Sequence, residues 1–216
     1  IGGSCARVCP VEALCEGACV EKTLVEKPIE IGRLQRYATD YVVESDKQLF
    51  EKGESNGKSV GIIGSGPAGL SCATYLARLG YSVTVYEKNS LAGGLDTYGM
   101  AEYKMTQADS LEEVKMIEKL GVEFKLNCEI RSEPLASAGG LDVSNSKDEI
   151  KPSAYADGSD LFVEHDAIFL GIGLGSSNDL NIVGEDLAGV WEALDFIEKI
   201  KTREWEMVPL GETVAV

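Results

Sequence analysis

The residues best suited to chemistry are four cysteines near the start of the chain. Cys5, Cys9, Cys15 and Cys19 follow the spacing C-x3-C-x5-C-x3-C, and Pro10 comes directly after Cys9. Such cysteines can bind an iron–sulfur cluster, which a Cys-Pro pair favours, or a zinc ion, whose cysteine pairs are usually closer in sequence. In a secreted protein they would form disulfides. The spacing alone leaves all three open, although the missing signal peptide predicts a cytoplasmic protein and disfavours disulfides.

A glycine-rich turn forms the second candidate site. Residues 64–69, GSGPAG, match the G-x-G-x-x-G fingerprint of dinucleotide-binding folds. Its glycines allow a tight turn, a close approach to a pyrophosphate and close packing of a helix on a strand. Glu87 follows Gly69 by 18 residues, where an acid can bind ribose hydroxyls. The turn therefore predicts a cofactor site made of Gly64, Gly66, Pro67, Ala68, Gly69, Glu87 and Lys88.

A second glycine pair indicates which dinucleotide this site binds. Gly93 and Gly94, followed by Leu95, would let the chain run close to a bound cofactor. Such a pair is typical of the FAD domain of flavoproteins that bind two dinucleotides. We therefore expect FAD and add these three residues to the site. The alternatives are an ordinary surface loop or an NADH-binding regulator whose fingerprint holds NAD.

The elements around the turn predict a Rossmann-like α/β domain. Residues 59–63 and 82–86 are expected to be strands on either side of a helix at 70–79, which completes a βαβ unit. Thr106 and Asp109 indicate a capping box at the start of a further helix. The remaining expected elements are a helix over 106–120, a strand over 122–126, loop or weak hairpin over 132–159, a buried strand over 167–173 and a helix over 191–201.

The segment before this domain is predicted to be small and mostly helical. Residues 21–57 are highly charged, and apolar positions recur from residue 34 at helical spacing. They are Leu34, Tyr37, Ala38, Tyr41 and Val42. Residues 52–58 are polar and contain glycine, which indicates a linker between the two parts of the chain.

Charge and hydropathy exclude several classes of partner. The 216 residues include 36 acidic and 20 basic side chains, for a formal net charge of −16. Because this charge repels phosphate backbones and acidic membrane surfaces, we expect no nucleic-acid partner and no membrane partner. No apolar run approaches the roughly 20 residues that a membrane-spanning helix needs. We expect His165 to be structural and the pair Glu112-Glu113 to be a solvated face.

In combination, these segments resemble the FAD- and iron–sulfur-containing NAD(P)H oxidoreductases typified by the glutamate synthase small subunit and the N-terminal half of dihydropyrimidine dehydrogenase. The resemblance rests on residues 5–20, 28–36, 60–73, 93–105 and 167–173. It implies two [4Fe–4S] clusters, with Cys9 and Cys15 on one and Cys19 on the other. Cys5 is a further candidate ligand, and Gln35 occupies the position of an unusual glutamine ligand. The other ligands would come from a cysteine group upstream.

The resemblance also implies a fragment of a larger chain with three parts. Residues 1–57 would be the C-terminal part of a helical [4Fe–4S] domain, 58–205 the first segment of the FAD domain, and 206–216 the start of a truncated NAD(P)H-binding domain. Electrons would pass from NAD(P)H through FAD to the clusters and on to a pyrimidine-reducing or glutamate-forming subunit or domain. No side chain is expected to act as a catalytic acid or base. The alternative is a non-catalytic nucleotide-binding module with a structural zinc or an empty cysteine loop.

Overall fold

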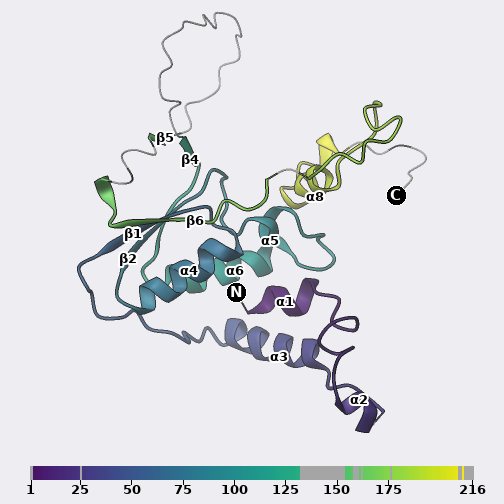
Figure 1. Ribbon diagram of the computed structural model, residues 1–216, viewed down its shortest axis with the longest axis horizontal. Helices are drawn as coiled ribbons and strands as arrows, with labels where there is room; N and C mark the ends of the chain where they lie inside the picture. Colours follow the sequence, from purple (N-terminus) through teal and green to yellow (C-terminus); the bar gives the residue numbers. More distant parts are fainter. Residues whose placement is uncertain are drawn as a thin grey trace, which may run out of the picture.

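The computed structural model describes residues 2–24, 26–131, 154–157, 161, 163–175, 177–208 and 211. Three N-terminal helices lie beside an α/β unit whose helices pack under a parallel sheet (Figure 1). These helices are α1 (Gly3–Val8), α2 (Glu21–Leu24) and α3 (Ile31–Glu44). Within the described ranges, no helix combines the length and the apolar character needed to cross a membrane.

The sheet contains four parallel strands in the order β3-β2-β1-β6. Ile62 of β1 lies opposite Val85 of β2 on one side and Phe169 of β6 on the other. Because all four strands run the same way, their carboxyl ends meet at one edge, where α/β proteins bind ligands. The strands are β1 (Ser59–Ile63), β2 (Ser82–Tyr86), β3 (Glu123–Lys125) and β6 (Ala167–Leu170).

Two helices bury their apolar faces in one core with this sheet. Helix α4 (Pro67–Arg78) contributes Leu70, Ala73 and Ala77, which are spaced as one face of a helix. Helix α6 (Gln107–Glu118) contributes Val114 and Ile117 to the same cluster. The predicted βαβ unit and Rossmann-like α/β class are therefore confirmed. The structure also describes two further helices, α5 (Leu95–Tyr98) and α8 (Ala193–Lys201), and the short 3-10 helix η1 (Trp205–Met207).

The capping box predicted for α6 is present. The Thr106 hydroxyl accepts the backbone N–H of Asp109, and the Asp109 carboxylate accepts the backbone N–H of Thr106, both at 3.2 Å. We expect Thr106→Ala to lower the free energy of unfolding by about 1 kcal/mol, because it leaves an amide of the first turn without its acceptor. Denaturant unfolding would measure this loss. Thr106→Ser keeps the hydroxyl, so an equal loss in that variant would contradict a capping role.

Two sequence-based expectations about the secondary elements were wrong, and a third is tested only in part. Strand β6 is not buried: it lies at the edge of the described sheet, and Leu170 is 66% exposed. Of residues 132–159, expected to be loop or weak hairpin, the structure describes only 154–157, which form a strand that pairs in parallel with its partner; the rest of that expectation lies outside the described residues. That pair is β4 (Cys128–Arg131) and β5 (Ala154–Asp157). The segment 21–57 was expected to be mostly helical, but its described helices cover only 21–24 and 31–44.

Helix α3 turns its polar side toward the rest of the molecule. Its apolar residues Leu34, Tyr37 and Tyr41 are 60%, 75% and 51% exposed. Gly32 is buried instead, and Thr39 and Asp40 are half-buried on the side that faces α1. The contact between α3 and its neighbours is therefore made mainly by polar and small residues.

Candidate functional site

The glycine turn lies at the carboxyl edge of the sheet between the ends of β1, β2 and β6. The Gly64 N–H donates to the carbonyl of Tyr86 at 2.8 Å, and the Gly171 N–H donates to the carbonyl of Ile63 at 2.8 Å. Gly64 has a φ of +95°, and a Cβ there would lie 2.4 Å from the carbonyl oxygen of Gly171. Only glycine therefore fits at Gly64, because three strand ends converge on it.

The two glycine segments predicted to hold a cofactor lie against each other. Gly94 has a φ of +57°, and a Cβ on it would lie 2.6 Å from the Cα of Gly66. The Gly93 N–H donates to the carbonyl and to the hydroxyl of Ser65, at 3.1 and 3.2 Å. The chain thus brings together two segments that are 28 residues apart in sequence. Leu95 and Lys88 are exposed beside them.

The start of helix α4 has the features of an anion site. Gly66 is its N-cap and provides no side-chain cap, and Pro67 occupies the first turn. Pro67 and Ala68 are exposed, and a Cβ on Gly66 would have its nearest neighbour 4.0 Å away. Amides at such an end favour negative charge, so the open space beside Gly66 fits a pyrophosphate. Gly69 is buried, and a Cβ there would lie 2.0 Å from the carbonyl oxygen of Gly64, so α4 packs directly on the turn.

Glu87 is buried at the end of β2 and points back at the glycine turn. Its carboxylate accepts the backbone N–H of Ser65 at 3.0 Å, the Ser65 hydroxyl at 2.6 Å and the backbone N–H of Asn89 at 2.9 Å. The acid expected to bind ribose therefore also fixes the first turn of the fingerprint. The sequence interpretation missed Ser65, although a hydroxyl residue between the first two glycines was a visible signal.

The four clustered cysteines are free thiols that do not converge on one point. Cys5 and Cys15 are exposed, and Cys9 and Cys19 are half-buried. Burial raises the pKa of Cys9, and the neighbouring Cys5 and Cys15 raise it further. Among the described residues, no three His, Cys, Asp or Glu side chains are grouped as metal ligands. The segment therefore presents part of a ligand set, with Cys5 and Cys9 adjacent.

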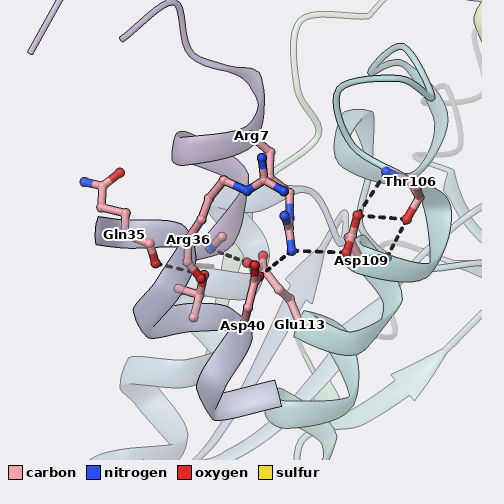
Figure 2. Close-up of polar contacts among 9 residues, drawn as sticks. Arg7, Gln35, Arg36, Asp40, Thr106, Asp109 and Glu113 are labelled. Carbon is pink, nitrogen blue, oxygen red and sulfur yellow. Dashed lines mark hydrogen bonds and ion pairs between the residues drawn. The ribbon is translucent and has the colours of Figure 1, made fainter. Parts of the chain in front are cut away.

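Gln35, on helix α3, carries an unpaired buried oxygen. Its side-chain oxygen Oε1 is buried and has no hydrogen-bond partner within the described part of the chain. In Figure 2 its side chain points away from the ion pairs that α3 makes with its neighbours. An unsatisfied buried oxygen costs about 1–3 kcal/mol, which a metal ligand role would offset. The donor chemistry of Cys9, Cys15 and Gln35 thus fits a share of one cluster's ligands.

His165 contacts the sheet from the side of β6. Its Nε2 lies 2.9 Å from the hydroxyl of Tyr86, and its ring meets that of Tyr86 edge to face. Burial raises the pKa of Tyr86. These packing contacts agree with the structural role expected for His165.

Helix α1 is joined to α3 and α6 by buried or half-buried charges. Figure 2 shows the Arg7 guanidinium between Asp40 of α3 and Asp109 of α6, at 2.6 and 3.1 Å. The Gly3 N–H donates to the carboxylate of Glu113 at 2.6 Å. Glu113 is only 7% exposed, so the expectation that it belongs to a solvated face was wrong. Its sequence neighbours gave no sign of this, because the partner lies 110 residues away.

A cavity of about 720 Å³ lies beside these charges, between α3 and α6. Its apolar lining includes Val42, Phe50 and Met116, and its polar lining includes Arg7 and Glu113. None of the residues predicted to bind FAD or a metal lines it. The cavity is therefore separate from the glycine cradle, which consists of residues 64–69 together with Gly93 and Gly94.

The buried position of Glu113 predicts a pH dependence of stability. Burial raises the pKa of Glu113 above its ordinary value of 4.5. Between 4.5 and the raised pKa the folded state keeps a proton that the unfolded state has released, so stability is greatest below 4.5 and falls as the pH rises through the raised pKa. Glutamine does not titrate. The wild type should therefore lose stability relative to Glu113→Gln as the pH rises from 4.5 through the raised pKa.

Denaturant unfolding across that pH range would measure the difference between the two proteins. Glu112→Gln is the matched control, because Glu112 is an exposed neighbour that pairs with Lys115 at 2.6 Å. A difference between wild type and Glu113→Gln that does not change with pH would contradict the prediction.

Two family models match the chain. The model described as dihydropyrimidine dehydrogenase domain II, 4Fe-4S cluster, matches residues 1–47, which hold the four clustered cysteines and Gln35. The model described as an NAD(P)-binding Rossmann-like domain matches residues 62–102, which hold the glycine turn, Glu87 and Gly93-Gly94.

Curated relatives match nearly the whole chain. The NAD-dependent dihydropyrimidine dehydrogenase subunit PreT homolog of Salmonella typhi is 31% identical over 96% of this chain and 44% of its own length. The NADPH glutamate synthase small chain of Escherichia coli K12 is 35% identical over 89% of this chain and 36% of its own length. Over these lengths the chain resembles this family of iron–sulfur NAD(P)H oxidoreductases. It spans less than half the length of these relatives.

These matches confirm the family resemblance inferred from the sequence motifs. The two matched relatives are named as a subunit and as a small chain, so each belongs to a larger assembly. The family's 4Fe-4S description also favours iron–sulfur over zinc for the cysteine segment. Among solved structures, FprA of Mycobacterium tuberculosis in complex with NADPH matches 70% of this chain and 30% of its own, with a TM-score of 0.50 and 23% identity. That likeness supports the Rossmann-like fold alone.

Proposed function

We propose that this chain is the electron-entry part of an NAD(P)H-dependent flavoprotein with [4Fe–4S] clusters. When bound, FAD would accept a hydride from NAD(P)H and release single electrons to the clusters, which deliver them to a partner subunit or domain. The observation that carries this proposal is the contact between Gly66 and Gly94 at the uncapped start of α4. It occurs in a chain whose residues 1–47 match the 4Fe-4S family model.

The residues of the cradle would each have a separate task in holding FAD. Gly64 and Gly69 keep the turn and α4 in contact, which aims the first amides of the helix at the pyrophosphate. Gly66 leaves space for that group, while Gly93 and Gly94 bring the second segment up to it. Glu87 would receive the ribose hydroxyls in place of the Ser65 hydroxyl that it accepts here. Pro67, Ala68, Lys88 and Leu95 would line the exposed rim.

The cysteine segment would supply part of two ligand sets. Cys9, Cys15 and Gln35 are proposed for one cluster and Cys19 for the other, with Cys5 as an additional candidate beside Cys9. The remaining ligands would come from outside this chain. We accordingly divide the chain into a helical iron–sulfur part over 1–57, a first FAD segment over 58–205 and the start of an NAD(P)H-binding domain over 206–216.

The acceptor is proposed to be a partner that reduces pyrimidines or forms glutamate. PreT is named as a dihydropyrimidine dehydrogenase subunit, and the other relative as a glutamate synthase small chain. Neither substrate would contact these residues, since reduction would take place in the partner. We place the protein in the cytoplasm, with neither nucleic acid nor membrane as partner, in keeping with its net charge of −16.

The test is an anaerobic visible spectrum of the full-length protein that carries this chain, with iron, sulfide and released flavin assayed on the same sample. We expect a flavin spectrum over a broad iron–sulfur absorption that bleaches on addition of NADH or NADPH. A colourless protein with zinc and no iron would overturn the proposal in favour of a non-catalytic nucleotide-binding module. Release of NAD instead of FAD would identify an NADH-binding regulator.

A further inference from the structure

Two buried acids of the α/β unit hold the beginning of helix α1. The Gly3 N–H donates to Glu113 of α6 at 2.6 Å, and Glu113 also accepts the backbone N–H of Ser4. Ser4 is 8% exposed, and its side chain hydrogen-bonds the carboxylate of Asp96 in α5. Gly3 and Ser4 are the two residues before Cys5. The start of the cysteine segment is therefore held by side chains of the α/β unit.

Asp96 stands two residues after the Gly93-Gly94 pair of the cradle. It is 7% exposed, and burial raises its pKa, while the hydrogen bond from Ser4 and the charge of Lys201 lower it. The backbone carbonyl of Asp96 accepts a hydrogen bond from the buried ammonium group of Lys201 at 2.9 Å. The same short helix therefore touches α1 through the Asp96 side chain and α8 through its backbone.

The contact is continued by the last turn of α1 and the first turn of α6. Arg7, one turn along α1 from Gly3, reaches both Asp109 of α6 and Asp40 of α3. A Cβ on Gly3 would lie 3.0 Å from the carboxylate oxygen of Glu113, so the small residue allows this close approach. A buried charged group that loses its hydrogen-bond partner is left unsatisfied, which costs free energy. These contacts therefore favour the one position of α1 in which every partner is paired.

We propose that Glu113 and Asp96 are positioning residues that dock α1, and with it the cysteine segment, onto α6 and onto α5, the short helix that follows Gly93-Gly94, so that electrons leave the flavin site across this contact. The inference rests on the proposed function. It assigns the two acids a role in electron transfer from the flavin site to the cysteine segment. Both acids contact the start of α1, and Asp96 is part of α5, the short helix that follows the cradle.

The experiment compares Glu113→Ala with wild type in the full-length protein loaded with its cofactors. Rapid anaerobic mixing with NAD(P)H separates flavin bleaching from the later appearance of the reduced-cluster signal in freeze-quenched electron paramagnetic resonance. We expect flavin bleaching to change by less than about twofold and cluster reduction to slow by about tenfold or more, since misplacing reacting groups is costly. Hydrogen–deuterium exchange of residues 3–8 should become about tenfold faster without any turnover.

Two controls separate positioning from a general loss of structure. Glu113→Gln keeps an oxygen that can accept the Gly3 N–H, so it should restore most of the transfer rate, and Glu112→Ala removes only the exposed neighbour. Where Glu113→Ala fails to fold, Ser4→Ala removes the hydrogen bond to Asp96 and is expected to show the same selective slowing. Faster exchange of residues 3–8 with an unchanged transfer rate would overturn the inference alone. A wild type without flavin or iron would overturn the proposed function as well.

Discussion

Gly69→Ala is expected to lower the free energy of unfolding by about 3 kcal/mol, because the added methyl group cannot be accommodated. Its Cβ would lie 2.0 Å from the Gly64 carbonyl oxygen and 3.2 Å from the Ile62 side chain. Backbone atoms of a turn held by Tyr86 and Gly171 cannot move away without opening the sheet edge. Helix α4 must therefore lift off β1. Denaturant unfolding of the full-length protein, followed by circular dichroism, would measure the loss.

Gly66→Ala is the matched variant, three residues earlier in the same turn. Its Cβ would meet no atom closer than 4.0 Å, so the stability should fall by less than about 1 kcal/mol, the usual loss for alanine at an N-cap. The methyl group would fill the space beside the start of α4, and this variant should purify without flavin. A folded Gly66→Ala protein with full flavin content would contradict the location of the cradle, whereas a stable Gly69→Ala protein would contradict the packing argument.

Lys201→Met is expected to lower the free energy of unfolding by about 3 kcal/mol, because two buried carbonyl groups lose their donor. Lys201 is 2% exposed, and its ammonium group donates to the carbonyls of Asp96 at 2.9 Å and Met105 at 2.8 Å. Burial lowers the pKa of Lys201, but a neutral amine would still donate both bonds. Because Asp96 follows the Gly93-Gly94 pair, flavin affinity should fall together with stability.

Lys199→Met is the control on the same helix. The Lys199 ammonium lies 5.6 Å from the centre of the Trp191 ring, a partly exposed contact that contributes about 0.5–1 kcal/mol. Thermal unfolding with released flavin as a second signal would compare the two variants. Equal losses in Lys199→Met and Lys201→Met would show that the buried carbonyl contacts add nothing to the stability of α8.

Features set by neighbouring residues could be predicted from the sequence. The βαβ unit follows from two short apolar strands around a glycine turn, and the capping box follows from Thr106 and Asp109 alone. In both cases the interacting groups lie close together along the chain, so their backbone geometry is determined locally. The proposed site residues Gly64 and Gly94 also have the positive φ and the close backbone approach that only glycine permits.

Features set by distant contacts could not be predicted. Glu113 resembles its exposed neighbour Glu112 in sequence, and only the arrival of Gly3 makes it a buried acceptor. Helix α3 has apolar residues at helical spacing, yet Arg7 reaches its other side and pairs with Asp40. Periodicity shows that a helix has two faces, but which face is covered depends on elements that pack there. Lys201 likewise gave no sign of its two buried acceptors, which lie 96 and 105 residues away.

Strand β6 pairs with β1 across a long separation, since Val60 is aligned with Ala167, 107 residues later. A ribosome adds about 5–20 residues per second, so this edge of β1 is without its neighbour for about 5–20 s during synthesis. In that interval the backbone N–H and C=O groups along Val60–Ile63 form a template for strands of other chains. The nascent protein is therefore expected to depend on ribosome-associated chaperones until residue 170 has left the exit tunnel.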